Sequence, residues 1–265
     1  MLPRRAAAGI VLLPLLLSGG RERPGGGDST TARRPADSVA SVAITVNLPA
    51  YRLDVSDSGR PVRRYRVTIG SADYPTPVGD FAVDLLELNP SWTPPASAWA
   101  RGRAPMPPGG ANPMGRAKLR LRPLYYIHGT PDGNAVGVAV SHGCVRMANH
   151  DVMDLVALAL TAGAPGMADT TRARLLGDPV GTHRVGLSRA IGATVRYELI
   201  EIIDGRVHAY PDVYRRRSPE AEREAQLLLE RAMAPRPAPA GLARRLLDEA
   251  RDAALSVPLD SVGPS

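Results

Sequence analysis

The chain has 265 residues and a net charge of +7, because 33 basic residues, all arginine except Lys118, outnumber 26 acidic residues. Aromatic residues make up only 4% of the chain, and no basic stripe alternates with them, which argues against a nucleic-acid-binding protein. A single cysteine, Cys144, excludes an internal disulfide framework.

Residues 1–20 have the pattern of a secretory signal. Arg4 and Arg5 precede an apolar run at 6–17, and small residues follow at 18–20. The run is shorter than the roughly 20 residues that a helix needs to cross a bilayer. No cysteine follows it, which argues against a lipoprotein anchor. We therefore expect a signal peptide or membrane anchor here, and export to the periplasm or cell envelope.

Residues 21–41 are rich in Gly, Ser, Thr, Pro and Arg, and they are predicted to form a flexible linker. The next stretch, 43–55, begins with alternating apolar residues. A turn at 57–59 then leads to a second apolar stretch at 62–69, which is the pattern of a β-hairpin. Another strand is predicted at 81–88. The region 42–216 is therefore expected to be a mainly β domain with a few helices.

Residues 89–117 are crowded with proline and glycine, and they are predicted to form a long loop. A loop of this length inside a compact domain is usually functional or disordered. Two interpretations remain open at this point: a lid over an active site, or an exposed and mobile insertion.

Short strands at 125–128 and 136–140 are predicted to bring His128 and the stretch 141–146 to one place. Cys144 in that stretch has three interpretations. It could be a small buried hydrophobe, a metal ligand together with histidines that include His142 and His150, or a nucleophile. The polar, glycine-containing surroundings favour the nucleophile and predict a lowered thiol pKa.

The rest of the chain is predicted to contain helices and one hairpin. A helix is expected at 151–160 with Gly163 as its cap, and a hairpin at 194–203 and 206–210. Beyond it, a helical tail at 217–265 holds two helices at 220–233 and 242–255. We expect these to be surface helices with solvated charged faces; a partner-binding role is the alternative, without a motif to support it.

The residues around Cys144 resemble the signature of the YkuD-type L,D-transpeptidases. His128 is separated by residues 129–140 from the run Ser-His-Gly-Cys-Val-Arg-Met at 141–147. Further similar stretches lie at 75–79, 89–95, 112–116, 204–208 and 211–214, and several are similar to the larger murein transpeptidases of this family. The resemblance covers roughly residues 42–214 and implies a YkuD-type β-sandwich.

This resemblance implies that Cys144 is the nucleophile and His128 the base. The backbone carbonyl of Gly129 would accept a hydrogen bond from the His128 ring and fix its tautomer. No metal or cofactor is implied. A carbapenem adduct on Cys144 is expected.

The remaining residues predicted for the site belong to the cysteine turn, with oxyanion-stabilising or substrate-binding roles. Backbone N–H groups of Gly143 and Cys144 would stabilise an oxyanion. His142 would orient the turn or be a structural histidine, and Arg146 would bind a substrate carboxylate or form a structural salt bridge. Ser141 completes the predicted set.

The implied reaction is the formation of 3–3 crosslinks in peptidoglycan. The cysteine would attack the third residue of a tetrapeptide stem, D-Ala would leave, and the amine of a second stem would resolve the thioester. The alternatives are an L,D-carboxypeptidase, in which water resolves the thioester, and a wall-binding protein without turnover. Neither the third residue of the stem nor the acceptor follows from the sequence.

Overall fold

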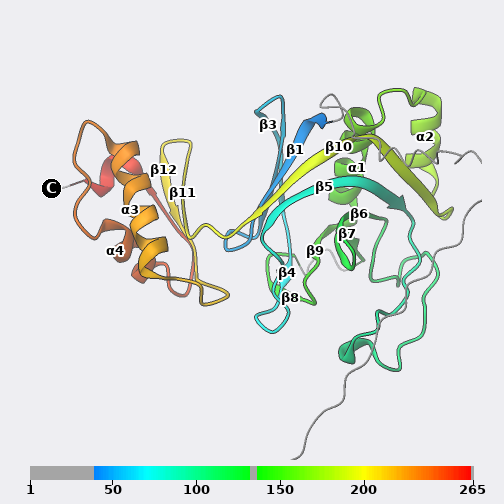
Figure 1. Cartoon of the computed structure of the whole chain (residues 1–265), viewed down its shortest axis with the longest axis horizontal. Helices are drawn as coiled ribbons and strands as arrows, with labels where there is room; N and C mark the ends of the chain where they lie inside the picture. The colour runs from blue at the N-terminus through cyan, green and yellow to red at the C-terminus, as the bar shows by residue number, and fades with distance from the viewer. Residues whose placement is uncertain (1–38, 132–135, 264–265) are drawn as a thin grey trace, which may run out of the picture. The chain divides into compact units, whose positions relative to one another are not determined.

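The computed structural model describes residues 39–131 and 136–263, and its largest element is a curved eight-stranded sheet (Figure 1). The predicted signal peptide or anchor at 1–20 lies outside the described residues, as does most of the linker predicted at 21–41, whose last residues belong to the first strand. Across the sheet, the strands are β3 (Arg60–Arg66), β2 (Arg52–Asp57), β1 (Val39–Asn47), β10 (His183–Arg196), β5 (Gly79–Leu88), β6 (Ala117–Arg122), β7 (Tyr125–Thr130) and β9 (Val145–Ala148).

The strands at the N-terminal edge form because apolar residues alternate with polar ones. In β1, Val42, Ile44 and Val46 are buried, and the residues between them are more exposed. The turn between β2 and β3 consists of Ser58 and Gly59, both at positive φ, which matches the right-handed twist of a hairpin. The predicted turn is confirmed, but the stretch predicted as one strand at 43–55 is two antiparallel strands, β1 and β2.

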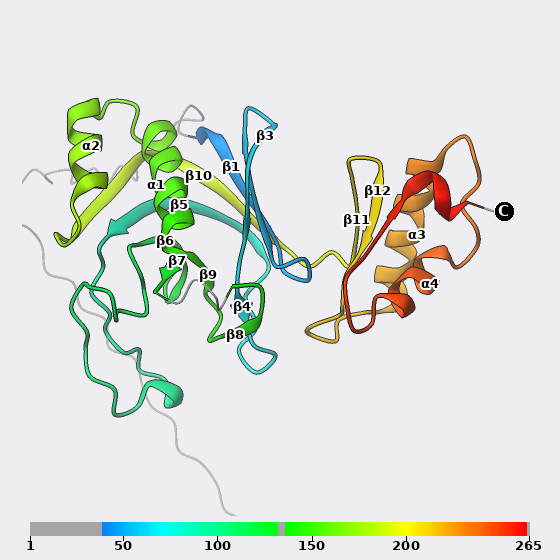
Figure 2. The same cartoon turned by 180° about the vertical axis from the view of Figure 1, so that it is seen from behind.

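Helix α1 (Asn149–Gly163) begins directly after β9 and packs against β1, β6, β7 and β10 (Figure 2). Its buried face includes Val152, Leu155, Val156 and Leu160, at helical spacing. The helix predicted at 151–160 is thus confirmed, although Gly163 is its last residue and Ala164 is the cap. The short helix α2 (Asp169–Gly177) was not predicted, because Leu175 is its only fully buried side chain.

A two-stranded parallel sheet lies next to the predicted cysteine turn. It consists of β4 (Ile69–Gly70) and β8 (Ala139–Ser141), with Gly70 opposite Ser141. The strand predicted at 136–140 therefore begins three residues later than expected, and it leads directly into the turn that holds Cys144.

The C-terminal unit, residues 197–263, has a core of its own. It contains a three-stranded sheet and two helices, which are β11 (Ile200–Ile203), β12 (Arg206–Ala209), β13 (Leu255–Pro258), α3 (Pro219–Met233) and α4 (Leu242–Glu249), followed by the short helix η4 (Leu259–Val262). Its core includes Leu199, Val207, Leu229, Met233 and Leu246.

The C-terminal unit differs from the predicted pair of solvated helices. Both helices bury one apolar side in the core of this unit. The second helix ends at Glu249, six residues earlier than predicted, and β13 begins at Leu255. The hairpin predicted around Asp204 and Gly205 is present as β11 and β12, but residues 194–196 belong to β10 in the large sheet.

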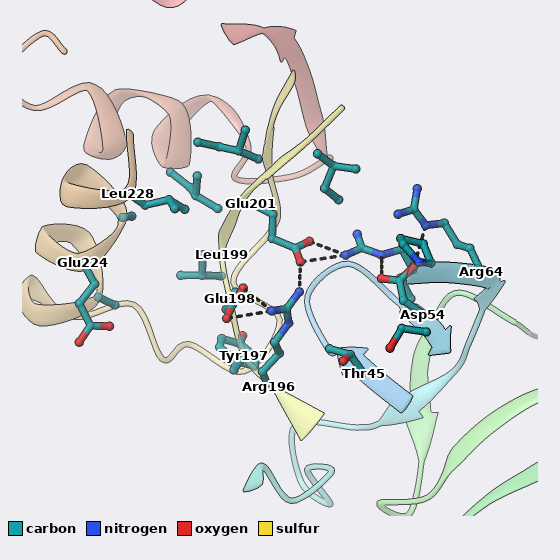
Figure 3. A pocket seen from close by; sticks show the side chains of 18 of the residues that line it. Thr45, Asp54, Arg64, Arg196, Tyr197, Glu198, Leu199, Glu201, Glu224 and Leu228 are labelled. Carbon is teal, nitrogen blue, oxygen red and sulfur yellow. Dashed lines mark hydrogen bonds and ion pairs between the residues drawn. The ribbon is translucent and has the colours of Figure 1, made fainter. Parts of the chain in front are cut away.

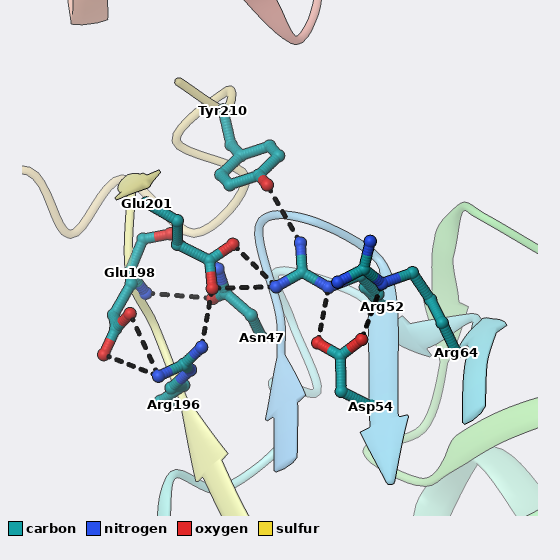
Figure 4. A network of polar contacts seen from close by, with 8 residues as sticks. All are labelled: Asn47, Arg52, Asp54, Arg64, Arg196, Glu198, Glu201 and Tyr210. Atoms are coloured by element: carbon teal, nitrogen blue, oxygen red, sulfur yellow. Dashed lines mark hydrogen bonds and ion pairs between the residues drawn. The ribbon is translucent and has the colours of Figure 1, made fainter. Parts of the chain in front are cut away.

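A buried network of charges connects the C-terminal unit to β1, β2 and β10 (Figure 4). The carboxylate of Glu201, only 4% exposed, accepts hydrogen bonds from Arg52 at 2.8 and 2.9 Å and from Arg196 at 2.6 Å. Arg52 also donates to the hydroxyl of Tyr210 at 2.9 Å. Because a buried carboxylate is stable only when it is paired, this network fixes β11 against the large sheet.

A pocket of about 650 Å³ adjoins this network (Figure 3). Strands β2 and β3, the end of β10, β11 and helix α3 supply its lining residues, which include Asp54, Arg64, Glu198 and Leu228. Cys144 and His128 are not among them. This pocket is therefore separate from the predicted reaction site.

Candidate active site around Cys144

The parallel pairing of β7 with β9 brings the two segments that hold the predicted catalytic residues side by side. Ile127 lies opposite Val145, and both are fully buried on the core side. Side chains alternate along a strand, so His128 and its partner Arg146 point to the other side. Cys144 comes directly before β9, close enough to Arg146 for the charge of Arg146 to act on its thiol. The pairing thus brings together residues that are sixteen positions apart in the sequence.

The cysteine turn is held by the hydroxyl of Ser141, which is completely buried. Ser141 donates to the carbonyl of Cys144 at 2.6 Å and accepts from the N–H of Gly143 at 3.1 Å. Gly143 has a φ of +101°, and a Cβ there would lie 2.7 Å from the ring of Tyr125. Only glycine fits this position. Because the N–H of Gly143 is used within the turn, the N–H of Cys144 is the remaining donor of the predicted oxyanion pair.

His128 is held as a neutral imidazole. Its Nδ1 lies 2.7 Å from the carbonyl oxygen of Gly129, which can only accept, so Nδ1 carries the proton and Nε2 has a free lone pair. Burial lowers the pKa of His128 to about 4, and the nearby charge of Arg146 acts in the same direction. At neutral pH the ring is therefore uncharged.

The thiol of Cys144 is protonated in this resting site. Burial raises its pKa, and this effect outweighs the opposing influence of a backbone hydrogen bond from Tyr126 and of the charge of Arg146. The sulfur lies 3.6 Å from the carbonyl oxygen of Leu124, an acceptor for the S–H. The prediction of a lowered thiol pKa is therefore wrong for this state, because the site is buried and the neighbouring His128 carries no charge.

Arg146 carries a partly buried charge that no acid neutralises. Within residues 39–131 and 136–263, no carboxylate lies within ion-pair distance of it, and its Nε is buried without a hydrogen-bond partner. Its pKa is lowered by burial. The structural salt bridge that was one interpretation of Arg146 is absent from the described part of the chain, which leaves a guanidinium beside Cys144 to meet an anion.

His142 is covered by two aromatic rings. Trp99 stacks on it with ring centres 3.9 Å apart and planes inclined by 14°, and Tyr74 lies at 4.8 Å. Trp99 lies on the short helix η2 (Ala98–Ala100), in the middle of the proline- and glycine-rich loop. That loop therefore reaches the cysteine turn. Trp99 was not predicted as a site residue, although a tryptophan in a polar loop is an unusual feature that could have indicated it.

Internal hydrogen bonds hold the loop in place. The side-chain amide of Asn112 donates to the carbonyls of Pro90 and Pro107, at 3.0 and 2.9 Å. Asn89, at the other end, donates to two carbonyls of the segment 178–181. Of the two interpretations left open by the sequence, the ordered lid agrees better with these contacts than the mobile insertion.

Tyr214 connects the C-terminal unit to the strand that supports the cysteine turn. Its hydroxyl donates to the carbonyl of Gly70 at 2.8 Å and accepts from the N–H of Thr76 at 3.2 Å. Gly70 pairs with Ser141, the residue that holds the turn. Sequence reasoning matched this stretch loosely but gave Tyr214 no role.

No cluster of metal-binding side chains supports the metal-site interpretation in the described part of the chain. No group of three His, Cys, Asp or Glu side chains is arranged there to hold an ion. His150, one of the proposed ligands, has a side chain that is 84% exposed and lies 3.1 Å from Asp151.

Comparison with known proteins identifies the domain. A family model of the YkuD L,D-transpeptidase catalytic domain matches residues 41–186, more than half of the chain. The chain belongs to this family. The prediction made from the motif around Cys144 is thereby confirmed, as is the mainly β fold with a few helices.

Relatives of this chain include two from Escherichia coli K12. The probable L,D-transpeptidase YbiS is 38% identical over 94 residues, covering 32% of this chain and 31% of the relative. The probable L,D-transpeptidase YcfS is 29% identical over 165 residues, covering 57% and 51%. The chain therefore spans only about a third to a half of the length of these relatives. The catalytic domain of the E. faecium L,D-transpeptidase, solved by NMR, is 16% identical with a TM-score of 0.38, covering 60% of this chain and 98% of that domain.

Among the described residues, no helix has the length and apolar character needed to cross a membrane.

Proposed function

We propose that this L,D-transpeptidase crosslinks peptidoglycan stem peptides through a thioester on Cys144. The observation that supports the proposal is the β7–β9 pairing, in which His128 lies opposite Arg146, two residues after Cys144, and Arg146 has no acidic partner among the described residues. A thiol, a neutral imidazole with a fixed tautomer and a backbone donor form the set needed for acyl transfer.

The protonation states indicate how the first step proceeds. Both partners are neutral at rest, so Nε2 of His128 takes the thiol proton as the sulfur attacks the carbonyl of the third stem residue. The S–C bond forms, the N–H of Cys144 stabilises the oxyanion, and the C–N bond to the terminal D-Ala breaks. His128 returns the proton to the departing amine.

The second step reverses these roles. The amine of a second stem attacks the thioester, His128 accepts a proton from that amine, and the protonated imidazole then restores the Cys144 thiol. The product is a 3–3 crosslink. Arg146 would hold a carboxylate of the donor stem, since its charge has no acidic partner among the described residues.

Hydrolysis of the same thioester is the competing outcome, and it would make the protein an L,D-carboxypeptidase. The ordered loop at 89–117, with Trp99 stacked on His142, supports transfer, because it covers the cysteine turn and can exclude water while an amine is held. A wall-binding protein without turnover would have no need for a base with a fixed tautomer.

Location and inhibition belong to the same proposal. A peptidoglycan substrate requires export, which the predicted signal or anchor at 1–20 would provide. A carbapenem, whose strained ring offers an electrophilic carbonyl, would acylate Cys144 in the same way as the stem.

Intact-protein mass spectrometry tests the proposal. Wild-type protein incubated with a tetrapeptide stem should gain the mass of the tripeptide acyl group, and the peptide products should contain crosslinked dimer. Cys144→Ala should give neither the adduct nor the dimer. Products that contain only tripeptide would replace transfer with hydrolysis, and unchanged turnover in Cys144→Ala would refute the nucleophile.

A further inference from the structure

A stacked arginine lies on one side of the cysteine turn. The guanidinium of Arg103 lies 5.9 Å from the centre of the Trp99 ring, and Trp99 stacks on His142. The charge of Arg103 also contributes to the lowered pKa of His142, which shows that the two side chains are close. Arg103 is exposed, so a ligand can reach it.

A second stacked arginine lies on the other side. The guanidinium of Arg122, at the end of β6, is 4.3 Å from the centre of the Tyr125 ring. Tyr125 covers Gly143, where an added Cβ would be 2.7 Å from the ring. Arg122 is also exposed. We call Arg103 and Arg122 the arginine rim, because each lies on an aromatic ring that contacts the turn before Cys144.

Neither charge of the arginine rim is neutralised within residues 39–131 and 136–263. No carboxylate is within ion-pair distance of Arg103 or Arg122, and neither guanidinium has a hydrogen-bond partner there. The preceding basic residues of β6 differ: Lys118 pairs with Glu87 at 3.2 Å and Arg120 with Asp84 at 2.7 Å. The two arginines that stack beside the cysteine turn therefore have no acidic partner among the described residues.

We propose that the arginine rim selects stem peptides that carry free carboxylates beside the scissile bond over the same peptides as carboxamides. This inference rests on the proposed function and defines its substrate class. A guanidinium stacked on a ring keeps its N–H edges free and pre-oriented for a carboxylate. An exposed pair of this kind changes a rate by about 1.4- to 5-fold, because its free energy is about 0.2–1 kcal/mol.

The experiment compares two synthetic tetrapeptide stems that differ only at their internal carboxyl groups, one with free carboxylates and one with carboxamides. The initial rate of acyl-adduct formation is measured for each by intact-protein mass spectrometry. We expect wild-type protein to react about 5-fold faster with the carboxylate stem, and the preference to decrease at high salt. The double variant Arg103→Gln, Arg122→Gln should show a ratio at least about 2-fold smaller than that of wild-type protein, with the remaining preference due to Arg146.

Arg101→Gln is the matched control. Arg101 lies two positions from Arg103 in the same loop and is exposed, but it stacks on no ring in the described part of the chain. Its variant should keep the wild-type ratio. Equal rates for both stems in wild-type protein, or a ratio that the double substitution leaves unchanged, would overturn the inference. A loss of the ratio in Arg101→Gln equal to that in the double variant would do the same. Failure of both stems to acylate wild-type protein would instead overturn the proposed function, and this inference with it.

Discussion

At the scale of single residues, the burial of His128 and its proposed role as the base both require an uncharged ring. Its buried ring must be neutral to accept the thiol proton, and burial itself keeps it neutral by lowering its pKa to about 4. The neutral Cys144 thiol fits this state, because a charged thiolate would be poorly solvated at the same place. The resting pair is therefore neutral, without a preformed ion pair, and in the proposed reaction the proton would transfer as the sulfur attacks.

This state makes the stability of the fold dependent on pH. In the unfolded chain the ring titrates near 6.5, whereas in the folded protein it stays neutral down to about 4. The unfolded state therefore binds more protons in this window, and stability falls as pH decreases from about 6.5 to 4. The expected contribution of His128 is about 3 kcal/mol.

Urea unfolding at pH 7, 5.5 and 4.5, with wild-type protein and His128→Gln, measures this contribution. The variant cannot gain a proton at this position, so its stability should decrease less with falling pH. His150→Gln is the control, because the His150 side chain is 84% exposed. A pH dependence that is identical in wild-type protein and His128→Gln would contradict the assignment of a neutral buried ring.

At the scale of elements, the loop at 89–117 depends on one aromatic contact with the site. Its own hydrogen bonds shape it, but Trp99 places it on the cysteine turn through His142. Replacement of Trp99 by alanine should leave the two ends of the loop in place and open its centre. Water would then reach the thioester more easily, and we expect the share of hydrolysed tripeptide to rise several-fold relative to dimer.

The measurement is the ratio of dimer to tripeptide after incubation with a tetrapeptide stem. Trp99→Phe is the matched variant, since a phenyl ring can still stack on His142 and should largely preserve the ratio. If Trp99→Ala and Trp99→Phe both retain the wild-type ratio, the loop does not control access of water.

At the scale of the whole described chain, the C-terminal unit contributes to the site through the segment that follows β12. Tyr214 reaches Gly70 and Thr76, and the Glu201 network fixes the same unit against β1, β2 and β10 (Figure 4). Removal of Glu201 would leave Arg52 and Arg196 without their shared buried partner. Glu201→Ala should therefore lower the free energy of unfolding by about 3–5 kcal/mol.

Chemical unfolding of Glu201→Ala tests this expectation, with Glu198→Ala as the control. Glu198 lies in the same network, but its contact with Arg196 is longer, at 3.3 Å, and its side chain is 45% exposed. Its variant should lose no more than about 1 kcal/mol. Similar losses in both variants would show that the buried position of Glu201 is not what stabilises the junction.

The sequence by itself determined the local features and the family. The alternation in β1, the turn at Ser58 and Gly59, the apolar stripe of α1 and the spacing from His128 to Cys144 each depend on residues that are close in the chain. Such patterns reflect side-chain periodicity and backbone preference, which act locally. They were sufficient to predict the mainly β class and the family.

Only the tertiary structure decided the electrostatics and the long-range contacts. Burial, which depends on everything packed around a group, reversed the expected direction of the Cys144 pKa. Two long-range contacts join segments tens of residues apart: Trp99 stacks on His142, and the Tyr214 hydroxyl donates a hydrogen bond to Gly70. No local sequence pattern encodes either contact. The same holds for the C-terminal helices, whose apolar sides are buried because β13 returns to pair with β12.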